Sequence, residues 1–180
     1  DLRRLHDGSG KWTTSVKRLA IEFLKHAGDY YRKPDGSQTS EYGCHQQALR
    51  IVVRLYGNEP ASKFGPKKLK AVQQELAENY VRTVANRHLS RIKHIFGWGV
   101  ANEMVPAEVA DGLKYVTGLK RGRSKAKEPE PVLPVSLGVV NKTLPHLPPI
   151  IREMVKLQLK TAARPSEIRT LRMCDVDTSG

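Results

Sequence analysis

The sequence has no long apolar run, few cysteines and a shortage of acidic residues. No stretch approaches 18 apolar residues and no apolar segment follows a basic N-terminal start, so we expect neither a membrane span nor a signal peptide, and a cytoplasmic location. Cys44 and Cys174 lie far apart without Cys-x-x-Cys or Cys/His spacing, which argues against a disulfide framework and a zinc site. A GxxxxGK loop, a metal-ligand cluster and a Ser/His/Asp arrangement are also missing, so ATPase, metallonuclease and hydrolase functions have little support, and we expect no cofactor.

Basic residues are in large excess. The 180 residues include 31 Lys plus Arg against 18 Asp plus Glu, a formal net charge of +13, with a pI near 9.9. Fourteen of the cations and five of the acids lie in residues 61–127, which therefore carry +9 of that charge. Such an excess points to a phosphate polyanion, and we expect double-stranded DNA as the partner. The alternative is a solvated surface that serves only solubility.

Apolar residues recur at helical spacing along most of the chain, which predicts an all-α protein. Thr14 or Ser15 is expected to cap the first helix, Thr83 to cap the longest, and Pro106 to close it. Met173 to Asp177 is expected to begin a strand. The predicted helices span about residues 15–28, 40–57, 66–77, 83–103, 107–116, 136–144 and 149–161.

Glycine and proline interrupt the helical pattern between residues 117 and 136. Five cations stand in this stretch without an intervening acid: Lys120, Arg121, Arg123, Lys125 and Lys127. We predict a flexible leader at residues 1–11, a helical domain at 12–116, a basic linker at 117–135 and the start of a second domain at 136–180. The candidate DNA contacts are the five linker cations together with Arg87, Arg91, Lys93 and His94 of the long helix, whose polar side is either DNA-facing or merely solvated.

The stretch from Thr161 to Asp177, TAARPSEIRTLRMCDVD, sets an Arg between two predicted helices with a Glu three residues later. It resembles the first catalytic-arginine motif of the tyrosine recombinases, or phage integrases, and the stretch from Leu89 to Pro106 looks like the last long helix of their core-binding domain. The resemblance implies a SAM-like core-binding bundle of four or five helices, a linker and a catalytic domain that together close around DNA. It also implies that Arg164 contacts the scissile phosphate and that Glu167 orients it. A guanidinium suits this role because its paired donors match phosphate oxygens and it stays charged.

The chain departs from that family's pattern in three ways. Ala162 stands where the family commonly has Gly. The pair His88 and Arg91 spells the family's His-x-x-Arg but precedes the first arginine instead of following it. No tyrosine occupies the nucleophile's place, because all six precede the end of the linker: Tyr30, Tyr31, Tyr42, Tyr56, Tyr80 and Tyr115.

We therefore expect a DNA-binding fragment of a site-specific recombinase, cut short at residue 180 and inactive by itself. The full-length enzyme would join DNA through a 3′-phosphotyrosine and assemble as a tetramer on paired sites. Two alternatives stay open: a stand-alone helical DNA-binding or regulatory protein, and a helical interaction protein whose basic surface is incidental.

Overall fold

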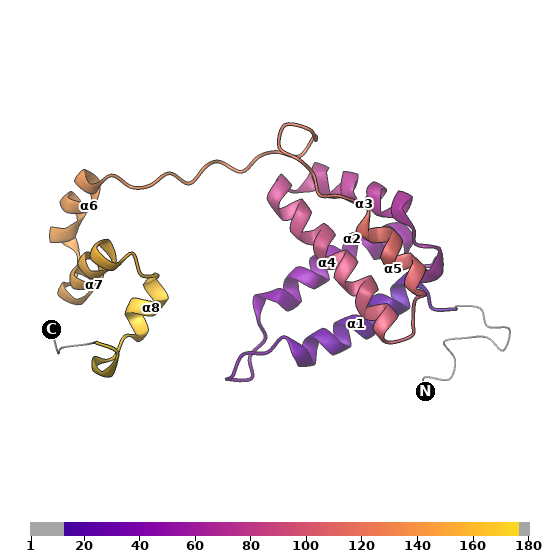
Figure 1. Ribbon diagram of the computed structural model, residues 1–180, viewed down its shortest axis with the longest axis horizontal. Coiled ribbons are helices and arrows are strands. Elements are labelled where there is room, and N and C mark those ends of the chain that lie inside the picture. The colour runs from indigo at the N-terminus through magenta and orange to yellow at the C-terminus, as the bar shows by residue number, and fades with distance from the viewer. Residues whose placement is uncertain (1–12, 177–180) are drawn as a thin grey trace. The chain divides into compact units, whose positions relative to one another are not determined.

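The computed structural model describes residues 13–176, and in this range the protein is all-α (Figure 1). No strand occurs in these residues, which contain only two isolated β-bridges. The expected leader, residues 1–11, lies outside the described residues. The α-helices are α1 (Val16–Tyr30), α2 (Ser40–Tyr56), α3 (Pro66–Asn79), α4 (Arg82–Ala101), α5 (Ala107–Lys114), α6 (Leu137–Thr143), α7 (Pro149–Thr161) and α8 (Pro165–Thr170).

The chain divides into two compact units between Glu130 and Pro131. The first unit contains α1 to α5 and the second contains α6 to α8. None of the helices in the described range is long and apolar enough to cross a membrane.

Helix α4 is the centre of the first unit, where it contacts α1, α2, α3 and α5 (Figure 1). Its buried face includes Leu89, Ile92 and Phe96, and the Phe96 ring stacks on Phe64 at 4.5 Å. Gly99 lets α4 approach the first helix closely, because a Cβ there would lie 2.7 Å from Leu19 Cδ1. Burial of these apolar side chains is the main source of the unit's stability.

The ends of the first helices follow local chemistry. The Ser15 hydroxyl accepts a hydrogen bond from Arg18 N at 3.1 Å and caps α1, as the sequence predicts. Helix α3 begins with Pro66 at its first position, where the missing N–H has no intrahelical partner to lose.

Two sequence-based predictions about element ends are wrong. The longest helix is capped by Val81 instead of Thr83, and its first N–H, from Arg82, is bonded by the Lys127 carbonyl at 2.8 Å. The expected strand at Met173–Asp177 is a short 3₁₀ helix, η4 (Met173–Asp175), with Asp177 outside the described residues. The Asp175 carboxylate accepts from Arg172 N at 3.0 Å, a local bond that favours a turn over a strand.

The second unit is built on the packing of α7 against α8. Among the described side chains of this unit, Ile168 of α8 is the buried apolar one, at 9% exposure. The Arg152 guanidinium ties α7 to the preceding 3₁₀ turn, η3 (Leu144–His146), by donating to the Leu144 carbonyl at 2.9 Å. An open apolar hollow of about 470 Å³ lies between α7 and α8.

Candidate nucleic-acid interface

Residues 117–128 form a strap that carries the five sequence-predicted cations. The Arg123 N–H donates to the Lys120 carbonyl at 3.1 Å and closes a turn, and Gly122 has a φ of 68° within it, a conformation that favours glycine. All five cations of this basic strap are exposed, and none forms an ion pair with any residue in the described range: Lys120, Arg121, Arg123, Lys125 and Lys127. Their charge is therefore available to an external anion.

The beginning of the basic strap is fixed to α4 by Asn86. The Asn86 side chain accepts from Leu119 N at 2.7 Å and donates to the Leu119 carbonyl at 3.0 Å, so it replaces the backbone partner that a strand would supply. Gly118 passes directly over it, because a Cβ on Gly118 would lie 3.1 Å from Asn86 Oδ1. A further bond, from Gln73 of α3 to the Thr117 carbonyl at 2.8 Å, attaches the strap to the neighbouring helix.

The end of the basic strap is fixed to the first turn of α4. Arg82 donates its backbone N–H to the Lys127 carbonyl, and its Nε lies 2.6 Å from Glu128 Oε1. The Arg82 guanidinium holds the pKa of the Glu128 carboxyl below its usual value. Between these anchors Ala126 is buried, at 8% exposure. The strap is therefore attached to the first unit at both of its ends.

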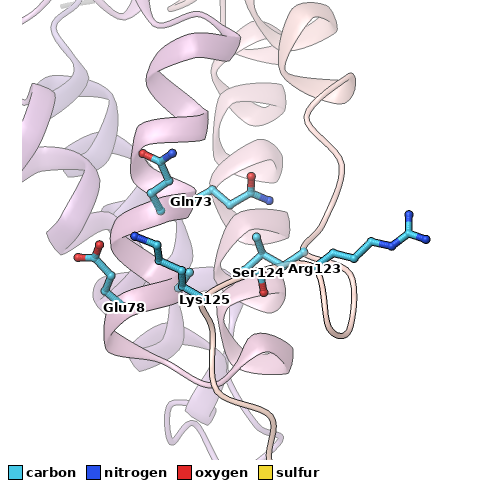
Figure 2. A pocket seen from close by; sticks show the side chains of 8 residues that line it. Gln73, Glu78, Arg123, Ser124 and Lys125 are labelled. Carbon is cyan, nitrogen blue, oxygen red and sulfur yellow. The ribbon is translucent and has the colours of Figure 1, made fainter.

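A cavity of about 400 Å³ lies between the basic strap and α3 (Figure 2). Glu78 of α3 and Ser124 and Lys125 of the strap line it, whereas the Arg123 side chain extends away from them in Figure 2. The Ser124 hydroxyl is buried and has no hydrogen-bond partner within the described chain. The cavity is polar, and the acid in its wall opposes the binding of a second anion there.

The four candidate residues of α4 fall into two groups. Arg87 and His94 are exposed and have no ion pair in the described structure. Arg91, by contrast, is 17% exposed and bonded to Glu41 of α2 through two nitrogens, at 2.6 and 2.8 Å. Lys93 donates to the Val116 carbonyl, and burial lowers its pKa. Arg91 and Lys93 thus hold neighbouring segments in place.

The Arg91–Glu41 pair shifts both groups toward their charged forms. The hydrogen bonds from Arg91 lower the pKa of the Glu41 carboxyl, and Glu41 raises the pKa of the Arg91 guanidinium. The pair borders a shallow hollow of about 380 Å³ between α2 and α4, which is lined by Tyr31, Glu41, His45, Arg87, Ser90, Arg91 and His94.

His45 is the unusual member of that hollow. Its side chain is 2% exposed, its ring lies edge-on to Phe23 at 4.9 Å, and neither ring nitrogen has a hydrogen-bond partner in the described residues. Burial lowers its pKa to about 4, although the Glu41 carboxylate, 3.7 Å from Nε2, opposes this shift. His45 is therefore neutral near pH 7.

The His88-x-x-Arg91 sequence does not form a joint site. His88 is buried against the Tyr80 ring at 4.9 Å, and burial lowers its pKa, whereas Arg91 is bound to Glu41. The two side chains therefore have separate structural contacts.

Arg164 stands at the N-terminus of α8, directly after the turn that ends α7. Ala162 makes this turn with a φ of 54°, the left-handed conformation that glycine adopts most readily. The Glu167 carboxylate accepts from Arg164 N at 2.8 Å and lies 3.5 Å from its guanidinium Nη1. With 83% of its side chain exposed, the guanidinium can bind an anion while Glu167 limits its range of positions.

Asn86 and Arg82 are the functional candidates that the sequence interpretation missed. Their spacing of four residues, with Lys93 seven further on, places these three polar residues on one face of the helix. This polar stripe is the sequence feature from which a contact with another segment could have been predicted.

The described residues thus define an all-α protein with an anchored basic strap and an exposed arginine at a helix start. They contain no group of three or more His, Cys, Asp or Glu side chains placed to hold a metal ion. Comparison of the chain with protein-family models, with curated proteins and with solved structures finds no match.

Proposed function

We propose that this chain is the DNA-binding portion of a site-specific tyrosine recombinase. The first unit, a helical bundle, would serve as the core-binding domain, and α7 and α8 would carry the first arginine of the active site. The observation that carries the proposal is the basic strap, none of whose five exposed cations forms an ion pair with an acid in the described residues. A surface that served solubility alone would have no need to hold such a segment in place.

The strap and the exposed side of α4 would supply contacts to the DNA backbone. Arg87 and His94 are available for such contacts, whereas Arg91 and Lys93 are already bound within the protein. Phosphate contacts of this kind fix position on the duplex and carry little sequence information.

The surroundings of Arg164 support the choice of recombinase class. An exposed guanidinium that is oriented by Glu167 fits two phosphate oxygens and can neutralise charge that develops at a phosphoryl group. The left-handed turn at Ala162 is the backbone geometry for which the family's usual glycine is suited.

A salt titration of duplex binding tests the proposal. We expect the logarithm of affinity to fall with the logarithm of salt concentration at a slope on the order of five, if about six cations displace counterions. Fluorescence anisotropy of a labelled duplex measures this slope. An affinity that does not depend on salt would refute DNA binding through the basic surface.

A matched pair of double variants locates the contacts. Arg121→Gln/Arg123→Gln removes two strap charges, and Lys17→Gln/Lys33→Gln removes two exposed charges elsewhere in the first unit. The strap variant should lose about two units of salt slope and bind more weakly, whereas the control should change little. Equal losses would mean that net charge alone drives binding.

The chain by itself is expected to leave DNA uncleaved, because none of its six tyrosines lies beyond Tyr115. Incubation with a nicked suicide substrate, followed by denaturing electrophoresis, tests this expectation. A covalent protein–DNA adduct would contradict it.

A further inference from the structure

We infer that Asn86 is a positioning residue for DNA binding: it holds the basic strap as one docked unit, so that the strap's cations are ordered before DNA arrives. The part of this inference that concerns DNA binding rests on the proposed function, whereas the part that concerns the docking of the strap does not. Asn86 carries no charge and is not itself expected to touch DNA.

Two of the strap's three anchors lie on one face of α4, and the third is the bond from Gln73 of α3 to the Thr117 carbonyl. Asn86 bonds both polar backbone atoms of Leu119, and Arg82, one helical turn earlier, bonds the Lys127 carbonyl and the Glu128 carboxylate. The Leu119 side chain also packs against the hydrophobic core. Since the segment between these anchors contains all five cations, detaching one anchor lengthens the free loop and disorders the charges.

The strap in turn stabilises the start of α4. The Lys127 carbonyl accepts from Arg82 N, one of the first-turn N–H groups of α4 that have no partner within the helix. Val81 at the cap position has no side chain that could replace this bond. Docking of the strap and completion of the start of α4 are therefore one event.

Gly118 supports this interpretation from the other side of the contact. A Cβ on Gly118 would lie 3.1 to 3.3 Å from the three terminal atoms of the Asn86 side chain, closer than ordinary van der Waals contact. Gly118 does not have a positive φ, so alanine is compatible with its backbone and would act only by displacing Asn86.

Ordering the cations in advance lowers the entropy cost of binding, because immobilised groups lose less freedom at the interface. Asn86→Ala should therefore weaken duplex binding by about fivefold to tenfold, the equivalent of roughly one to two net hydrogen bonds. The salt slope should stay as in the wild type, because the same cations still reach the same phosphates. A lost affinity with an unchanged slope separates positioning from the removal of a charge.

The experiment combines binding with amide exchange. Duplex affinity at several salt concentrations is measured for the wild type, Asn86→Ala and Gly118→Ala, with Asn102→Ala as the control. Asn102 is the matched choice because it ends the same helix and its side chain donates only to the Trp98 carbonyl. Hydrogen exchange of the Arg82 N–H, monitored by NMR without DNA, reports whether the Arg82 anchor opens when the Asn86 anchor is removed.

The inference predicts weaker binding with an unchanged slope and faster Arg82 exchange in both strap variants, and neither effect in Asn102→Ala. If the wild type binds DNA and both Asn86→Ala and Gly118→Ala bind it with the same affinity, the inference is overturned and the proposed function is left intact. Unaltered Arg82 exchange in both variants would likewise overturn docking as one unit. If the wild type did not bind DNA, the proposed function would fail, and so would the part of the inference that concerns DNA binding. Exchange of the Arg82 N–H would then decide by itself whether the strap docks as a unit.

Discussion

His45 should make the folded protein sensitive to mild acid. Its imidazole is buried against Phe23 without a hydrogen-bond partner in the described structure, and its pKa is lowered from 6.5 to about 4. Between these two values the unfolded chain binds a proton that the folded chain does not, so stability falls as the pH falls from about 6.5 to about 4.

The size of the effect follows from the two pKa values. Fully developed, a difference of about 2.5 pKa units corresponds to about 3 kcal/mol, and the part lost between about pH 7 and about pH 5 is roughly 2 kcal/mol. His88 adds a loss of the same sign, because burial lowers its pKa as well.

The variant His45→Leu isolates this contribution. Leucine fills a similar volume and leaves no polar atom unpaired, so stability near pH 7 should be equal or higher. Urea unfolding at both pH values, followed by far-ultraviolet circular dichroism, should give a loss smaller than that of the wild type by roughly 2 kcal/mol. The exposed His146 supplies the control His146→Gln, which should keep the wild-type loss. An identical loss in His45→Leu and the wild type would refute the argument that burial keeps the His45 ring neutral.

Three further tests concern packing, pairing and backbone conformation. Gly99→Ala should destabilise the first unit by about 1–3 kcal/mol through overpacking, whereas Gly97→Ala on the open side of the same helix should stabilise it by about 0.5–1 kcal/mol; urea unfolding that ranks the two equally would contradict the close approach of α4. Arg91→Ala should cost about 2 kcal/mol in the same assay because it breaks a paired contact to α2, and Arg87→Ala should cost little, so similar losses would show that the contact contributes nothing. Ala162→Gly should raise the thermal stability of the second unit by roughly 0.5–1 kcal/mol, and a decrease would contradict the left-handed turn.

The positions of the helices could be predicted because they depend on local periodicity. Segments such as α1 and α7 place apolar residues every three or four positions, and capping groups such as Ser15 lie next to them in the sequence. The prediction of a strand at Met173–Asp177 is wrong for a local reason as well. The Asp175 side chain bonds the nearby backbone N–H of Arg172, which favours a turn over an extended strand.

The contacts of the basic side chains could not be predicted, because their partners lie far away in the sequence. Arg91 pairs with Glu41 at a separation of 50 residues, and Asn86 binds Leu119 at a separation of 33. A helical projection shows which residues share a face, but it does not reveal which acid or carbonyl covers that face. The role of Arg164 is different: its exposure and its bond to Glu167 are local, and its catalytic part stays a prediction.

The bond from Arg82 N to the Lys127 carbonyl has a practical consequence for where this protein can be divided. A cut at residue 116, where the helical pattern in the sequence ends, would leave the start of α4 without its partner and expose the buried surface under Ala126. A cut after Glu130 would keep both anchors. For the same reason, transfer of this helical unit to another protein would preserve its fold only if the transferred segment included residues 117–128.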